Sequence, residues 1–175
     1  MLFLCDTERP WPSPWPTGLQ VWRAHEGDVC GWRQLWPGPV AACPVAPPGA
    51  LWEPLRPGTE ILGPDGAPVE GQTPFLYTVE TDVIPGAAED FHAWYEQEHL
   101  PGLARVPGCV RARRLVRQDG PSGLPRHVAC YELMAAEVTH SAPWLAVRHT
   151  DWSGRVRPTF CNTRRTMWAR QAPSP

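Results

Sequence analysis

Residues Phe75–Val83 read FLYTVETDV and alternate β-branched or aromatic residues with polar ones. This period of two is typical of a strand with one buried face. A Pro-Gly turn follows, and helical periodicity then runs from Ala87 to His99, with acidic residues in the first turn, where they suit the helix dipole. The segment predicts a strand followed by a helix that ends or kinks at Pro101.

Four further segments of the second half extend this pattern. Alternation returns in Cys109–Arg117 and His127–Leu133, which we predict to be strands. Ser141–Pro143 is typical of a helix start, and Phe160–Ala169 could form a last strand. The order of elements predicts an α+β, ferredoxin-like β-α-β-β-α-β fold, in which two helices cover one face of a four-stranded antiparallel sheet.

The first half has a different composition. The first 74 residues hold more than half of the 23 prolines and of the 10 tryptophans, with strand-like runs at Met1–Cys5, Leu19–Ala24 and Val40–Val45. We therefore predict a Pro/Trp-rich, β-rich half, residues 1–73, and a ferredoxin-like domain, residues 74–175. Residues 10–16, PWPSPWP, cannot be helical. They form either a polyproline ligand for a partner or, as we predict, a rigid arm whose tryptophans pack on the protein's own core.

The second face of the predicted sheet needs a cover. A second subunit can supply it, which predicts a homodimer. The first half of the chain is the alternative cover. In that case a monomeric pseudo-dimer is viable, with residues 1–73 as a degenerate ferredoxin-like unit.

Composition excludes several classes of protein. The 175 residues carry 16 basic and 18 acidic side chains, and every basic one is Arg. This balance argues against a nucleic-acid partner, and no apolar run is long enough to span a membrane. The six cysteines form no CxxC pair and no signal peptide is evident, so we expect free thiols and a cytoplasmic location. Neither a dinucleotide-binding glycine turn nor a P-loop is present, and we expect no cofactor.

The predicted helix carries two sets of side chains on neighbouring sides. At about 100° per residue, Glu98 falls on the apolar side, where an acid lies either near the rim or beside a partner. The adjacent side could place three metal ligands on one face, but ligands from a single helix rarely close a site, so we predict no metal. The apolar side consists of Phe91, Trp94, Tyr95 and Glu98, and the adjacent side of His92, Glu96 and His99.

The pattern Trp94-Tyr95-x-x-Glu98-His99-Leu100-Pro101, followed by Val106-Pro107-Gly108, resembles the EthD-like group of the dimeric α+β barrel superfamily. The segments Ala129–Leu133 and Trp152–Pro158 also resemble this group, so the resemblance covers roughly residues 75–170. It implies a ferredoxin-like fold related to muconolactone isomerases and antibiotic-biosynthesis monooxygenases. It also implies that His99 lies at the mouth of a cavity between sheet and helices as the acid/base catalyst. Glu98 would orient its ring or balance its charge.

A histidine beside an aromatic cavity could move a proton on a bound molecule. Tyrosines could donate to a developing enolate, and an arginine such as Arg113 or Arg164 could clamp a carboxylate. The alternatives are core packing for the tyrosines and a solvated strand face for the arginines. The predicted substrate-binding residues are Trp94, Tyr95, Tyr77, Tyr131 and Arg113.

Together these residues predict a small, cofactor-independent enzyme. It would carry out isomerisation, cyclisation, decarboxylation or oxygenation on a hydrophobic aromatic or polyketide-like small molecule. The alternative is a non-catalytic binding protein for an aromatic ligand, which the tryptophan excess favours.

Overall fold

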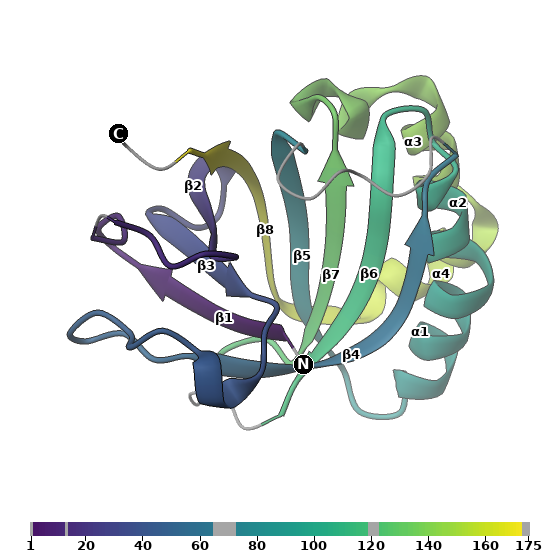
Figure 1. The fold of residues 1–175 in the computed structure, drawn as a ribbon. Helices are drawn as coiled ribbons and strands as arrows, with labels where there is room; N and C mark the ends of the chain where they lie inside the picture. Colours follow the sequence, from purple (N-terminus) through teal and green to yellow (C-terminus); the bar gives the residue numbers. More distant parts are fainter. Residues whose placement is uncertain (1, 13, 65–72, 119–122, 173–175) are drawn as a thin grey trace.

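The computed structural model is a closed barrel of antiparallel strands with short helices packed on one side (Figure 1). It describes residues 2–12, 14–64, 73–118 and 123–172. Around the barrel the strands follow the order β1-β3-β2-β8-β5-β7-β6-β4, and β4 pairs with β1 to close it. The strands are β1 (Leu2–Thr7), β2 (Gln20–Gly27), β3 (Trp32–Trp36), β4 (Glu53–Leu62), β5 (Phe75–Val83), β6 (Cys109–Arg117), β7 (His127–Leu133) and β8 (Phe160–Gln171).

The helices belong mainly to the second half of the chain. The first one is continuous through three parts, α1 (Ala88–Trp94), the π-helical turn η2 (Tyr95–His99) and α2 (Leu100–Ala104). Pro101 does not end it, although its ring supplies no N–H donor, and it lies near the start of α2, directly after the π-helical turn. The other helices are α3 (Ala142–Arg148), α4 (Asp151–Val156) and the short 3-10 helices η1 (Val40–Ala42), η3 (Ala136–His140) and η4 (Arg157–Thr159).

The prediction of a ferredoxin-like β-α-β-β-α-β fold of the dimeric α+β barrel type is wrong. Strands β5, β6 and β7 have the predicted bounds, but they do not belong to an open four-stranded sheet. The strands that would be its edges, β8 and β6, pair with β2 and β4 of the first half. An unpaired edge exposes a row of N–H and C=O groups, and the closed eight-stranded barrel leaves no such edge between these strands.

The strands of the first half follow the sequence pattern only in part. The runs Met1–Cys5 and Leu19–Ala24 correspond to β1 and β2, although Met1 lies outside the described residues. The run Val40–Val45 is not a strand, because η1 occupies its beginning. The structure adds β3 and β4 instead.

The prolines of β4 make this strand hard to recognise in the sequence. Pro54 and Pro57 lie within the strand, and proline normally argues against one because it cannot donate to the ladder. Here β1 pairs only with Glu53–Leu55, so the strand beyond Leu55 has β6 as its sole neighbour. The pairing with β6 also shifts register between Pro57 and Glu60, and such a bulge tolerates proline.

Tryptophans of the Pro/Trp-rich segment pack on the protein itself, as predicted. Trp11 is buried with Leu19 and Val21, and Trp15 packs against this cluster. The ring of Trp11 lies 5.5 Å from that of Trp52. The arm therefore closes over the first half of the chain.

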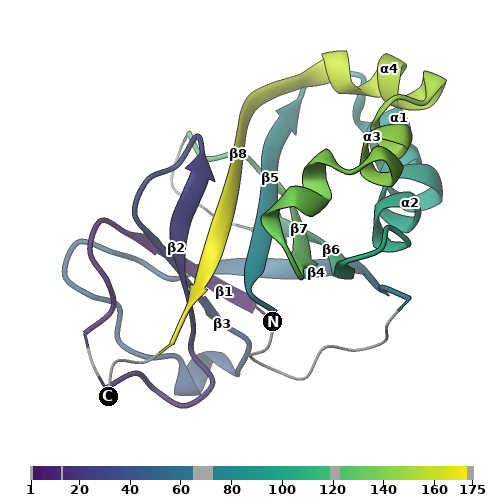
Figure 2. The ribbon, with the colours of Figure 1, turned by 90° about the horizontal axis from the view of Figure 1, so that it is seen from above.

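Two apolar cores lie on opposite faces of the strands β5–β8. One of them takes a side chain from every strand, for example Leu4, Trp22 and Trp168, and therefore fills the barrel interior. The other lies between the outer face of β5–β8 and the helices, which stand together on that side (Figure 2). Because side chains alternate along a strand, Leu76 faces inward while Tyr77 faces the helices.

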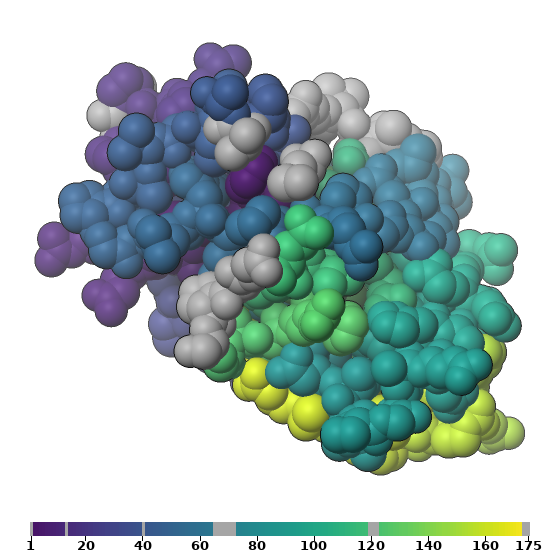
Figure 3. All heavy atoms as spheres, turned by 90° about the horizontal axis from the view of Figure 1, so that it is seen from below, coloured from purple at the N-terminus to yellow at the C-terminus, as the bar shows by residue number. Residues whose placement is uncertain are grey.

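The face that was expected to need a second subunit is covered within the chain by β1–β4. The space-filling view shows the first half, purple to blue, in contact with the second half, teal to yellow (Figure 3). No uncovered sheet face therefore favours a homodimer among the described residues, and the oligomeric state stays a prediction. Among the described residues, none of the helices has the length and apolar character needed to cross a membrane.

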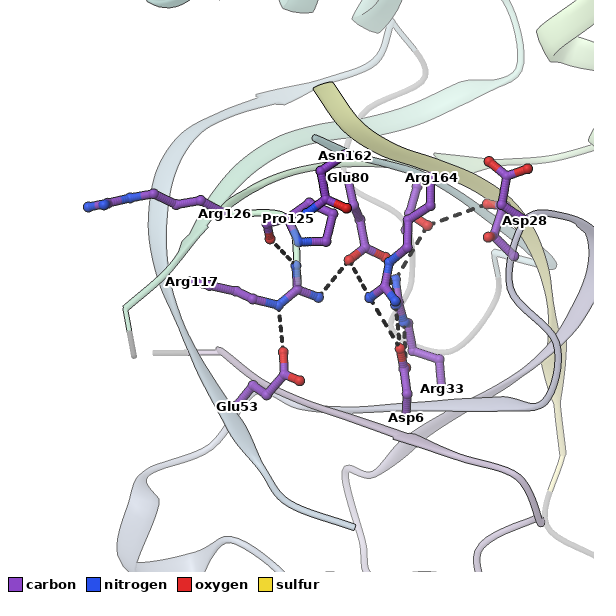
Figure 4. Close-up of polar contacts among 12 residues, drawn as sticks. Asp6, Asp28, Arg33, Glu53, Glu80, Arg117, Pro125, Arg126, Asn162 and Arg164 are labelled. Carbon is purple, nitrogen blue, oxygen red and sulfur yellow. Dashed lines mark hydrogen bonds and ion pairs between the residues drawn. The ribbon is translucent and has the colours of Figure 1, made fainter. Parts of the chain in front are cut away.

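A network of ion pairs fills one end of the barrel interior (Figure 4). At its centre the buried carboxylate of Glu80 accepts hydrogen bonds of 2.6–2.8 Å from three arginines. Burial alone would raise the pKa of Glu80, but the three guanidinium groups outweigh burial and lower it. Asp6 also pairs with Arg33 at 2.6 Å, and Glu53 with Arg117 at 2.5 Å. The network consists of Arg33, Arg117, Arg164, Asp6, Glu53 and Glu80.

Candidate functional site

A small hollow lies between the helices and the outer face of the sheet. Its volume is about 20 Å³, which is room for one water-sized group. Helix α3 contributes Trp144, and the first helix contributes His99, which is buried there. Aromatic side chains form most of the wall: Tyr77, Trp94, Tyr95, Tyr131 and Trp144.

His99 reaches this hollow because of the π-helical turn. The backbone N–H of Leu100 donates to the carbonyl of Tyr95, five residues back instead of four. The turn therefore holds one extra residue, and every later side chain is shifted by one position around the helix. His99 takes the place on the buried stripe that regular α-helical spacing assigns to Glu98.

The ring of His99 is held firmly and kept neutral. It stacks on the indole of Trp94 with 4.0 Å between ring centroids, and Tyr95 meets it edge-on at 5.4 Å. Burial, which is the larger cause, and the positive charges of Arg157 and Arg148 together lower the pKa of His99 to about 3. The imidazole is therefore uncharged at neutral pH.

Buried polar atoms gather at the hollow without protein partners. Among the described residues, Nδ1 of His99 and Nε1 of Trp144 have no hydrogen-bond partner. The buried hydroxyl of Tyr131 lies beside that of Tyr95. An unsatisfied buried polar group costs about 1–3 kcal/mol, so such groups normally take a water molecule or a bound group as partner. The residues that carry these atoms line the hollow, which has room for one water molecule or one polar group of a ligand.

Five of the predicted site residues come together here. His99, Trp94, Tyr95, Tyr77 and Tyr131 all line the hollow. Burial raises the pKa of Tyr95 to about 12 and also raises the pKa of Tyr77 and Tyr131. The three phenols therefore stay protonated at neutral pH and are available as hydrogen-bond donors.

Glu98 and Arg113 do not line this hollow. Oε1 of Glu98 accepts a hydrogen bond of 2.6 Å from Oγ1 of Thr150, the residue that caps α4. Arg113 lies on the opposite face of β6 from Ala112 and donates to Oε1 of Glu132 at 2.9 Å. The Glu98–Thr150 bond instead ties the π-helical turn to the start of α4.

The residues considered as metal ligands are separated. His99 is buried at the hollow, whereas His92 and Glu96 are exposed and contact Arg114, each at 3.1 Å. In the part of the chain that the structure describes, no group of three side chains is arranged to hold a metal ion.

Three arginines that line the hollow were not among the predicted site residues. Arg148 comes from α3, Arg157 from η4 and Arg165 from β8. On β8 the candidate was Arg164, but strand alternation points Arg164 into the barrel and Arg165 toward the helices. A four-residue spacing from Trp144 to Arg148 was the signal available on α3, because it places both on one helical face.

A larger groove adjoins the hollow. Its volume is about 390 Å³, within the usual size of a small-molecule site. Tyr77, Arg148 and Arg165 line both spaces and so form the boundary between them. Exposed Glu26 and Glu137 line the groove farther out. A ligand in the groove would contact the arginines at the entrance to the hollow of His99.

Two solved structures share this fold. A candidate monooxygenase from Fusobacterium nucleatum superposes with a TM-score of 0.56 and 8% identity, covering 98% of this chain and 92% of that one. A candidate monooxygenase from Lactobacillus acidophilus gives a TM-score of 0.51 and 13% identity, covering 90% of this chain and 80% of that one. No protein-family model matches the chain, and no curated protein matches it either. At these identities the likeness shows the fold alone.

Proposed function

We propose that this protein is a small, cofactor-independent enzyme that carries out acid/base chemistry on a hydrophobic aromatic or polyketide-like molecule. The observation that carries the proposal is the buried, unpartnered Nδ1 of His99 at an aromatic hollow. Oxygenation is one of the reactions that fit, and the two structures of similar fold are candidate monooxygenases. The resemblance of the helix to the EthD-like group points to the same range of chemistry.

The neutral imidazole would act first as a base. The substrate would lie in the groove, with its reacting C–H or O–H directed at the hollow. Stacking on Trp94 fixes the ring plane of His99, which preserves its orientation during proton transfer. Tyr95 and Tyr131, which remain protonated, would donate to the oxygen that gains negative charge.

The low pKa of His99 makes it a weak base in the empty site. A negative charge that develops on the substrate would oppose the effect of Arg148 and Arg157 and raise this pKa. Glu98 would act as a positioning residue, because its bond to Thr150 holds the turn that places His99.

A non-catalytic binding protein for an aromatic ligand is the second candidate. The same low pKa favours it, since a weakly basic imidazole serves more readily as a hydrogen-bonding group than as a proton acceptor. In this case the aromatic hollow and groove would capture a ligand and leave it unchanged.

Intrinsic tryptophan fluorescence and product analysis separate the two functions. Trp94 and Trp144 line the hollow, so a panel of hydroxylated naphthalenes and anthracenes should change their emission on binding. We expect conversion by the wild type and a loss of at least about 100-fold in turnover for His99→Ala. His149→Ala, at an exposed position outside the hollow, is the matched control. Unchanged turnover in folded His99→Ala would remove His99 from the mechanism, and binding without conversion would favour the second candidate.

A further inference from the structure

Among the described residues, the arginines at the hollow lack the acidic partners that Arg33, Arg117 and Arg164 have in the barrel interior. Among the described residues, no carboxylate lies within 4 Å of the guanidinium groups of Arg148, Arg157 or Arg165. Asp28 is close to Arg165, but its carboxylate accepts from the backbone N–H of that residue at 2.7 Å. Arg157 donates only a long hydrogen bond of 3.4 Å, to the carbonyl of Arg148.

The three side chains also repel one another. Burial lowers the pKa of Arg157, and the charges of Arg148 and Arg165 add to this effect. Like charges gathered beside partly buried aromatic walls are unfavourable unless another charge offsets them. Glu26 and Glu137 on the groove do not, because neither forms an ion pair with these arginines in the described structure.

The arginines lie where the groove meets the hollow. Arg148 and Arg165 line both the groove and the hollow, and Arg157 lines the hollow beside His99. Guanidinium groups bind carboxylates through two parallel N–H donors, which gives both affinity and orientation. An anionic group held here would place the adjoining carbon atoms next to the unpartnered Nδ1 of His99.

We propose that the ligand of this site carries a carboxylate, bound by Arg148, Arg157 and Arg165 at the boundary between groove and hollow. The inference rests on the proposed function, because it names the substrate class of the same site: an aromatic or polyketide-like carboxylic acid. The bound anion would also offset the two arginine charges that act on His99. Substrate recognition and activation of the base would therefore be one event.

Isothermal titration of 2-naphthoate and of its uncharged analogue 2-naphthamide tests the proposal. The two probes share one aromatic body and differ mainly in charge. For the wild type we expect naphthoate to bind at least about tenfold more tightly than naphthamide. Arg148→Gln and Arg165→Gln should each reduce this ratio, whereas Arg148→Lys should retain part of it through its charge. Arg105→Gln is the control, since Arg105 is exposed and lines neither space.

A second measurement follows the imidazole itself. Saturating naphthoate should raise the pKa of His99, read from its ring signals by NMR, while naphthamide should leave it low. Equal affinity of the wild type for the two probes would overturn the carboxylate inference alone, and this comparison requires no variant to fold. A ratio unchanged in folded Arg148→Gln and Arg165→Gln would overturn it too. Failure of both probes to bind would overturn the proposed function as well. A strong preference for naphthoate together with full turnover in His99→Ala would overturn only the catalytic role of His99.

Discussion

The protein contains two clusters of three arginines that differ in their partners. Inside the barrel, Arg33, Arg117 and Arg164 surround the buried Glu80, and Asp6 and Glu53 complete the charge balance (Figure 4). At the hollow, three further arginines have no carboxylate partner among the described residues. They are Arg148, Arg157 and Arg165.

The same side chain therefore serves two purposes in this protein. A buried arginine whose carboxylates are supplied by the chain joins strands together, and removal of one partner leaves an uncompensated buried charge. An arginine whose partner is missing from the chain is available for a ligand. The comparison predicts that the interior cluster controls stability, while the cluster at the hollow controls binding.

Substitution Glu80→Gln should break the interior cluster most severely. It removes the carboxylate shared by three arginines, and loss of one partner from a buried ion pair costs about 3–5 kcal/mol. The free energy of unfolding, from urea denaturation followed by circular dichroism, should fall by this amount. Glu8→Gln is the control, because Glu8 is exposed and its change should stay within about 0.5 kcal/mol. Equal stability of the two variants would contradict a structural role for the network.

Acid should affect the two regions in different pH ranges. The pKa of His99 falls from 6.5 to about 3 on folding, so the unfolded chain binds this proton more readily and stability is lost as pH falls below 6.5. Glu80 has a folded pKa below its ordinary 4.5, so its contribution is kept until pH falls below 4.5. Between pH 6.5 and 5, His99 should account for a loss of about 2 kcal/mol.

The variant His99→Gln directly measures how much His99 contributes to the pH dependence of stability. Its free energy of unfolding should drop less between pH 6.5 and 5 than that of the wild type, by about 2 kcal/mol. The free energy of unfolding of the variant should still fall somewhat in this pH range, since burial also lowers the pKa of His127, to about 4. His149→Gln, at an exposed position, should follow the wild type. An identical pH dependence for His99→Gln would show that His99 titrates normally in the folded protein.

Arg157→Gln should have the smallest effect on stability. It relieves repulsion at the hollow and removes only a long hydrogen bond, so the free energy of unfolding should stay constant or rise by up to about 1 kcal/mol. Arg117→Gln, which breaks two interior ion pairs, is the matched contrast and should destabilise the protein. A large loss for Arg157→Gln would show that the two clusters do not differ as described.

Sequence patterns predicted the elements of the second half because each has a clear period. Alternation located β5, β6 and β7, and Ser141 indeed caps α3 by accepting from the N–H of Trp144. The barrel could not be predicted, because closure depends on pairing between distant strands. One of these, β4, contains two prolines that hide its period.

The sequence predicted which helix carries the candidate site, but not how that helix is wound there. The aromatic residues and His99 lie together, as predicted. A regular period of 3.6 residues nevertheless assigned the buried position to Glu98, because such a period contains no signal for a π-helical turn. The arginines of the hollow come from three separate elements, α3, η4 and β8, which only the tertiary structure brings together. Because side chains alternate along β8, Arg165 faces the hollow and its neighbour Arg164 does not.

The wide turn at Tyr95–His99 has a consequence for the evolution of this hollow. Loss of the codon for His99 itself would restore regular winding and carry the carboxylate of Glu98 into the place that the imidazole holds, while every later side chain kept its position. A lineage could thus exchange a basic group for an acidic one without changing any side chain around the hollow. The length of this segment, and not only its composition, is then subject to selection.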